Sequence, residues 1–119
     1  MSLDNNQLNE VDLSGLVNLE VLSLSCNKLL EVDLSGLVNL KELSLGGYNL
    51  TEIDLSDLVN LEFLNLRNNQ LAEIDLSRLV NLKEMYLEYN ILDVGYVIKM
   101  ISKNDNILPK LYRCDLFFG

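Results

Sequence analysis

Apolar residues recur along the chain with a period of 21 residues. The segment 11–19 reads Val-Asp-Leu-Ser-Gly-Leu-Val-Asn-Leu, and closely similar segments follow at 32–40, 53–61 and 74–82. The copies continue into a Leu-x-x-Leu-x-Leu-x-x-Asn-x-Leu pattern, with Tyr48 in place of the asparagine in the second full copy and Met85 in place of a leucine in the last. A fixed period of this length is typical of a solenoid, in which each repeat stacks only on its two neighbours. The pattern therefore predicts one structural unit for every 21 residues.

Each repeat contains a short stretch in which apolar and polar residues alternate, as in Leu22-Ser23-Leu24. Alternation with a period of two indicates a half-buried strand, and one strand per repeat would stack in parallel about 4.8 Å from the next. The asparagine that follows, Asn27 in this repeat, is expected to close the turn, because its amide can satisfy backbone groups that the turn leaves unpaired.

The segment that returns to the next strand is too short for a long helix and predicts a tight turn or a single 3₁₀ turn on the convex side. Asp33 and Ser35 carry side chains that cap such turns. Three apolar side chains of the same segment are expected to point inward: Val32, Leu34 and Leu37.

The repeat resembles that of the leucine-rich-repeat family. Its 21-residue length and its Leu-Val-Asn-Leu motif are similar to those of the short bacterial, internalin-like and phosphatase-regulator-like members, and the resemblance covers nearly the whole chain. It implies an α/β-type repeat solenoid, a right-handed horseshoe with a parallel β-sheet on its concave face and short turns on its convex face. One α-helix is expected near the C-terminus.

The chain is expected to divide into residues 1–92, which hold a partial first repeat at 1–10 and the 21-residue repeats, and residues 93–119. In the second part the repeat pattern returns after 29 residues instead of 21. The inserted residues carry apolar side chains at helical spacing behind Asp93, a residue suited to an N-cap. This part is therefore predicted to be a longer, helix-containing repeat or C-terminal cap that ends in a final strand.

The net charge is −9 and histidine is absent. An acidic chain without a basic stripe is not expected to bind nucleic acid. Without histidine, most zinc sites and every histidine-based catalytic triad are excluded, so we expect neither a cofactor nor an enzymatic activity. No apolar run reaches the roughly 18 residues needed to cross a bilayer, so membrane insertion is not expected.

Eight of the carboxylates belong to two columns that repeat with the solenoid. Without them the formal charge is about −1, so we expect the concave face to carry little excess charge. Calcium binding needs six to eight converging oxygens, whereas each column supplies one carboxylate per repeat, which favours a capping role. The columns are Glu10, Glu31, Glu52 and Glu73, and Asp12, Asp33, Asp54 and Asp75.

The two cysteines, Cys26 and Cys114, fall four repeats apart, roughly 20 Å at strand spacing, which is too far for a disulfide. Secreted leucine-rich domains of animals and plants usually carry flanking cysteine clusters, which this chain lacks. We therefore favour the cytoplasm, with a secreted or surface location as the alternative if the chain is a fragment. Cys26 is expected at an exposed turn.

The residues that vary between repeats are those that a strand directs away from the core. Aromatic and arginine side chains gather at these positions in the C-terminal half, whereas serine and glycine occupy them in the N-terminal half. Aromatics and arginine are the usual hot-spot residues of protein interfaces. Aromatics also favour strands and could cap the last repeat, as Phe118 could. The candidate binding residues are Phe63, Arg67, Tyr86, Glu88, Tyr89, Tyr112, Arg113 and Phe118.

These observations predict a non-enzymatic module that binds a protein partner through the aromatic C-terminal half of the concave face. The face measures on the order of 350 Å² from strand spacing and rise, below the roughly 800 Å² per partner of a standard interface. A structural element that self-associates end to end into a homo-oligomer, or a fragment of a larger leucine-rich-repeat surface or effector protein, is therefore the alternative.

Overall fold

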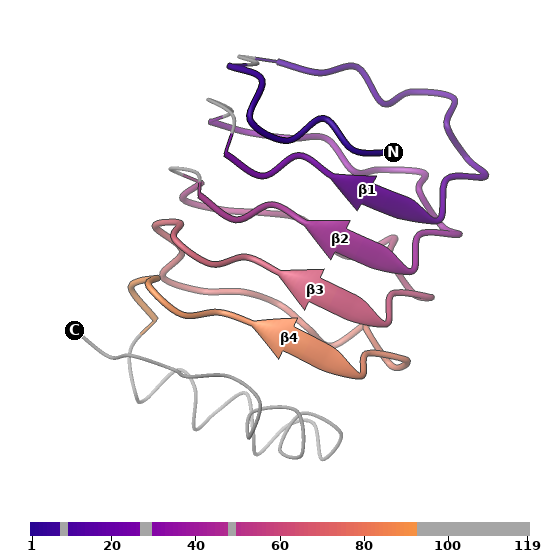
Figure 1. The fold of residues 1–119 in the computed structure, drawn as a ribbon. Coiled ribbons are helices and arrows are strands. Elements are labelled where there is room, and N and C mark those ends of the chain that lie inside the picture. The colour runs from indigo at the N-terminus through magenta and orange to yellow at the C-terminus, as the bar shows by residue number, and fades with distance from the viewer. Residues whose placement is uncertain (8–9, 27–29, 48–49, 93–119) are drawn as a thin grey trace.

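The repeats form one open, parallel β-sheet, as predicted (Figure 1). The computed structural model describes residues 1–7, 10–26, 30–47 and 50–92. Neighbouring strands pair in a register of 21 residues, so that Leu22 lies beside Leu43 and Leu43 beside Leu64. The strands follow one another in chain order: β1 (Val21–Ser23), β2 (Glu42–Ser44), β3 (Phe63–Asn65) and β4 (Glu84–Tyr86).

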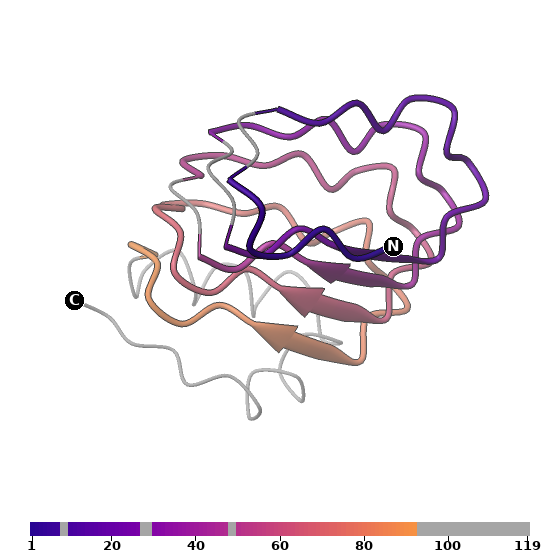
Figure 2. The same ribbon diagram turned by 45° about the horizontal axis from the view of Figure 1, so that its top comes forward.

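The core lies behind this sheet, between the strands and the chain segments that return from one strand to the next (Figure 2). The central residue of each strand points into it, and Leu43, Leu64 and Met85 are 0% exposed. The residues on either side of each central position face away from the core. Removing leucine side chains from water supplies the main stabilisation of the stack, because apolar burial is the dominant favourable term in folding. Sequence alternation thus places one column of every strand inside and its neighbours on the concave face.

The edge of β1 that faces away from β2 is paired with the first residues of the chain. The backbone N–H of Leu3 donates to the carbonyl of Ser23 at 2.8 Å, and Ser23 donates to the carbonyl of Met1 at 2.8 Å. One more bond of the same kind joins Asn5 N–H to the carbonyl of Ser25 at 2.9 Å. These bonds have the pattern that joins the complete repeats, so the partial first repeat covers the edge of the sheet.

The return segments are tight turns capped by the aspartate column. The backbone N–H of Ser14 donates to a carboxylate oxygen of Asp12 at 2.9 Å, and Ser35 donates to Asp33 at 3.0 Å. The later repeats do the same at Asp54–Ser56 and Asp75–Ser77, both at 2.9 Å. The capping role predicted for this column is therefore confirmed.

The same caps predict how stability depends on pH. The hydrogen bonds from the hydroxyl and then the N–H of Ser35 lower the pKa of Asp33 from its usual value, and those from Ser56 do so for Asp54. A carboxyl whose pKa is lowered by folding stabilises the folded chain above its unfolded pKa and loses that contribution as pH falls through its folded pKa. We expect the midpoint temperature of thermal unfolding to decrease as the pH is lowered below about 4. A variant with Asp33→Asn and Asp54→Asn should show a smaller fall between pH 5 and pH 2.5, and parallel curves would contradict the assignment.

A buried asparagine closes the turn after each of the last two described strands. The side-chain NH₂ of Asn69 donates to the carbonyls of Leu45 and Leu66 at 3.1 and 3.0 Å, and its carbonyl oxygen accepts from the N–H of Leu50 at 3.2 Å. Asn90 makes the corresponding three bonds one repeat later. Each asparagine thus joins its own turn to the previous repeat, as the sequence predicted for this position.

The predicted division at residue 93, the helix behind it and the final strand lie outside the described residues. Among the described residues, no helix is long and apolar enough to span a membrane.

Candidate functional site

The concave face consists of the outward side chains of the four strands and of the turns that follow them. Its two halves differ, because Ser23, Ser44 and Gly46 are small whereas the corresponding residues of β3, β4 and their turns are large. Side chains in one column are separated by one strand spacing, about 4.8 Å, so large neighbours must contact one another. The contrast predicted between a smooth N-terminal half and an aromatic C-terminal half is therefore present on the described face.

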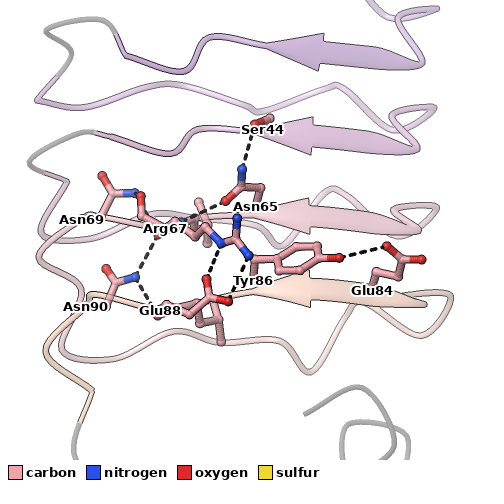
Figure 3. Close-up of polar contacts among 10 residues, drawn as sticks. Ser44, Asn65, Arg67, Asn69, Glu84, Tyr86, Glu88 and Asn90 are labelled. Carbon is pink, nitrogen blue, oxygen red and sulfur yellow. Dashed lines mark hydrogen bonds and ion pairs between the residues drawn. The ribbon is translucent and has the colours of Figure 1, made fainter. Parts of the chain in front are cut away.

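Phe63, Arg67 and Tyr86 form one packed cluster, which we call the aromatic platform. Figure 3 shows Arg67 and Tyr86 of this cluster with their polar neighbours. The ring centroids of Phe63 and Tyr86 are 5.7 Å apart with an angle of 51° between the ring planes. The guanidinium carbon of Arg67 lies 4.4 Å from the centroid of the Tyr86 ring. Both geometries are favourable, since tilted aromatic pairs and cations over an aromatic face attract one another. Residues from two neighbouring repeats thereby hold one another in fixed orientations.

Glu88 fixes the guanidinium of Arg67 from below. Its two carboxylate oxygens accept from Nε and from the terminal NH₂ of Arg67, the second at 3.1 Å, in a two-point ion pair. The side chain of Glu88 is only 5% exposed, whereas that of Arg67 is 45% exposed. The sequence predicted that Glu88 contacts a partner, but this carboxylate is buried and paired within the chain. It positions Arg67, and Arg67 presents the accessible part of the pair.

A row of polar side chains joins the platform to the N-terminal half of the face. The hydroxyls of Ser25 and Ser44 lie 2.8 Å apart, and the side-chain NH₂ of Asn65 donates to Ser44 at 3.2 Å. The carbonyl oxygen of Asn65 then accepts from the backbone N–H of Arg67 at 3.1 Å. These bonds cross three repeats and leave the floor of the face satisfied and ordered.

One column of the face has a left-handed backbone in every described repeat. Its residues are Asn5, Cys26, Gly47, Asn68 and Tyr89, with φ between 60° and 87°. Glycine and asparagine tolerate this conformation, whereas a bulky side chain there costs roughly 1–2 kcal/mol. Tyr89 nevertheless occupies it with 61% of its surface exposed. The conformation recurs in each repeat, so the turn imposes it and Tyr89 accepts the strain.

We predict that Tyr89→Asn stabilises the chain, because asparagine already occupies this column at positions 5 and 68. The free energy of unfolding should rise by about 0.5–1 kcal/mol as the strain is relieved. Urea unfolding of the wild type and the variant measures the difference. An unchanged or lower stability would show that packing of the Tyr89 ring outweighs the strain of its backbone.

The concave face is acidic. Its described columns hold four carboxylates (Asp4, Glu42, Glu84 and Glu88) and one guanidinium (Arg67), which leaves a formal charge of −3. The expectation of little excess charge is wrong for these repeats, because the described lysines, Lys41 and Lys83, lie on a different column. A surface charge of one sign favours a partner of the opposite sign.

That other column borders the face where the chain enters each strand. Lys41 pairs with Glu20 at 3.3 Å and Lys83 with Glu62 at 2.7 Å, so the charges of the column cancel. Beside it, three exposed asparagines donate to the carbonyl of a valine in the previous repeat: Asn39, Asn60 and Asn81. Neither column was predicted from the sequence, although the charge alternates at positions 21 residues apart, from Glu20 to Lys83. The groove between them is lined by these ion pairs and by asparagines already bonded to the backbone, which is typical of structural ladders.

The structure brings Phe63, Arg67, Tyr86 and Glu88 together, and it places Tyr89 on the turn that follows β4. Tyr112, Arg113 and Phe118, the other predicted binding residues, lie outside the described residues, as does Cys114. Cys26 is exposed on its turn, as predicted.

Comparisons with known proteins agree with this arrangement. The family model for two copies of leucine-rich repeats matches residues 38–78, and that for a single leucine-rich repeat matches residues 18–40. No curated protein matches the sequence.

Among solved structures, a leucine-rich-repeat protein of Leptospira interrogans superposes with a TM-score of 0.83 and 28% identity, covering 99% of this chain and 30% of its own. The functional domain of InlJ from Listeria monocytogenes, which includes a cysteine ladder, gives 0.71 and 32% over 80% of this chain and 22% of its own. A chain of the SNF/U2A′ complex of Drosophila melanogaster gives 0.72 and 26% over 98% of this chain and 72% of its own. The chain thus spans less than a third of the two bacterial proteins.

Proposed function

Because the chain belongs to the leucine-rich-repeat family, whose domains generally mediate protein–protein interactions, we propose that it binds a protein partner on the aromatic platform. Members of this family are typically non-enzymatic interaction modules. The proposal assigns the partner to Phe63, Arg67 and Tyr86, with Tyr89 at the edge of the contact.

The proposal is supported mainly by the contacts through which these side chains hold one another in fixed orientations. Tyr86 lies between the ring of Phe63 and the guanidinium of Arg67, and Arg67 is held in turn by the buried carboxylate of Glu88. Immobilising a flexible side chain on binding costs about 0.5–1.5 kcal/mol, so side chains that are already fixed lose less. Preorganised aromatic and arginine side chains are the kind that dominates binding energy at protein interfaces.

A solved structure with this fold supports protein binding in general, without indicating which surface binds. The Drosophila chain with this fold was solved as part of a complex between SNF and U2A′. A chain of this fold can therefore work as one component of a protein complex. The area of the concave face is small, so contacts from the turns, including Tyr89, are expected to extend the interface.

The proposal is tested by site-specific photo-crosslinking in an extract of the organism that encodes the chain. A photo-reactive phenylalanine analogue replaces Tyr89 in one variant and Val80 in another, because these side chains are 61% and 60% exposed but lie at different places in the repeat. We expect a crosslinked protein from position 89 and little from position 80. Equal crosslinking from both positions, or crosslinking from position 80 alone, would refute the assigned surface.

A further inference from the structure

The N-terminal half of the concave face contains a shallow depression beside the aromatic platform. It has a volume of about 160 Å³, and Val21 and Phe63 form its apolar walls. Ser23 and Ser44 line it as well, and their small side chains leave it open. Val21 is 43% exposed, so one apolar wall is accessible to a ligand.

Glu42 stands between the two walls. It pairs with Val21 on one side and with Phe63 on the other in the strand register, so its carboxylate rises from the middle of the depression. Because Glu42 occupies the gap between the walls, the open space of the depression lies beside it, over the small side chains of Ser23 and Ser44.

Glu42 takes part in none of the ion pairs among the described residues. Lys41, its neighbour in sequence, pairs with Glu20 at 3.3 Å, and the guanidinium of Arg67 pairs with Glu88. Glu42 is exposed to solvent, and within the described part of the chain no ion pair neutralises it. A carboxylate between two apolar walls combines the two features that a lysine or arginine side chain requires, namely a surface for its alkyl stem and a counter-charge for its end.

We infer that this depression receives a lysine or arginine side chain of the protein partner. The stem of that side chain packs over Ser23 and Ser44 against the apolar walls, its charge meets Glu42, and the Phe63 ring adds an attraction for the cation. The inference rests on the proposed function, because it assigns one anchor of the partner bound on the neighbouring platform. It extends the interface into the half of the face that the sequence left without a role.

The charge of the surrounding face supports a basic anchor over an apolar or acidic one. The described columns of the face carry a formal charge of −3, and Glu84 adds a second carboxylate to the column of Glu42. An acidic side chain of a partner would meet repulsion there, and a purely apolar one would desolvate Glu42 without compensation.

The test uses two blocked peptides as probes, Ser-Gly-Arg-Gly-Ser and the same peptide with citrulline, which has the same shape as arginine but no charge. Each is titrated into the full chain, and backbone amide shifts are followed by nuclear magnetic resonance. We expect saturable shifts at Val21, Glu42 and Phe63 with the arginine peptide, and an affinity about threefold to fivefold lower with citrulline. Glu42→Gln should lower the arginine response by the same factor. Glu52→Gln, which removes an exposed carboxylate that does not line the depression, should leave it unchanged.

Equal responses to the two peptides, an arginine response that survives Glu42→Gln, or no saturable response in the depression would each overturn the inference. These outcomes are separate from failure of the proposed function. A partner that crosslinks to position 89 but binds Glu42→Gln as tightly as the wild type would leave the platform standing and reject the basic anchor. An arginine response without any crosslinked partner would support the depression while refuting the proposed surface.

Discussion

Replacing Asn69 with alanine is expected to lower the free energy of unfolding by about 2–4 kcal/mol, one of the largest single losses that the described structure predicts. The variant removes two hydrogen bonds that join neighbouring repeats, to the N–H of Leu50 and to the carbonyl of Leu45, and one within its own turn, to the carbonyl of Leu66. Asn69 is 5% exposed and Leu50 is 1% exposed, so water has little access to replace these bonds. A buried backbone group without a partner costs about 1–3 kcal/mol.

Asn60→Ala is the matched control, because it removes an asparagine of the exposed ladder. Asn60 donates one bond, to the carbonyl of Val38 at 2.8 Å, and both ends of this bond can be hydrated. We expect a loss below about 1 kcal/mol. Urea unfolding monitored by circular dichroism measures both variants. Equal losses would show that burial does not distinguish the two asparagine ladders.

Much of the fold could be predicted from the sequence, because in a solenoid the local pattern and the tertiary structure share one period. Alternation around Leu22 marked the strand, and the Asp33–Ser35 pair marked the capped turn. The buried asparagine was recognised as a turn-closing residue because its amide carries both a donor and acceptors. Each of these features repeats with the chain, so one repeat shows what the others do.

The features that the sequence did not reveal depend on which residues meet across repeats. Glu88 was taken for a surface residue, but Arg67 lies one repeat away in the same column and draws its carboxylate into a buried pair. The left-handed backbone at Tyr89 has no sequence signal of its own, although glycine at 47 and asparagine at 68 were consistent with it. The net charge did not reveal the acidic face, because it sums the charges of columns that lie on different sides of the molecule.

The sequence also predicted end-to-end self-association, which stays a prediction. The edge of β1 is paired with the first residues of the chain, so the described N-terminal end of the sheet begins at a partial repeat and not at β1 itself. A sedimentation-equilibrium mass that rises with protein concentration would support self-association, and a constant monomer mass would refute it.

The second large effect is expected in partner binding when the aromatic platform is removed. Phe63→Val and Tyr86→Ser together introduce the residues that the same columns carry at Val21 and Ser44, so the strands keep side chains they already accommodate. Hot-spot aromatics contribute about 2 kcal/mol or more each, so loss of both should weaken binding at least about 100-fold. Arg67 also loses the ring on which it rests and is expected to become less ordered.

Isothermal titration calorimetry of the crosslinked partner with the wild-type chain and with this double variant is the most direct measurement. Val38→Ala with Val80→Ala serves as the control, since both valines are exposed on another part of the repeat, and thermal unfolding establishes that all three proteins are folded. The account predicts a loss of about 100-fold or more for Phe63→Val/Tyr86→Ser and less than about twofold for the valine pair. A folded double variant that binds within about twofold of the wild type would contradict the assignment of function to the aromatic platform.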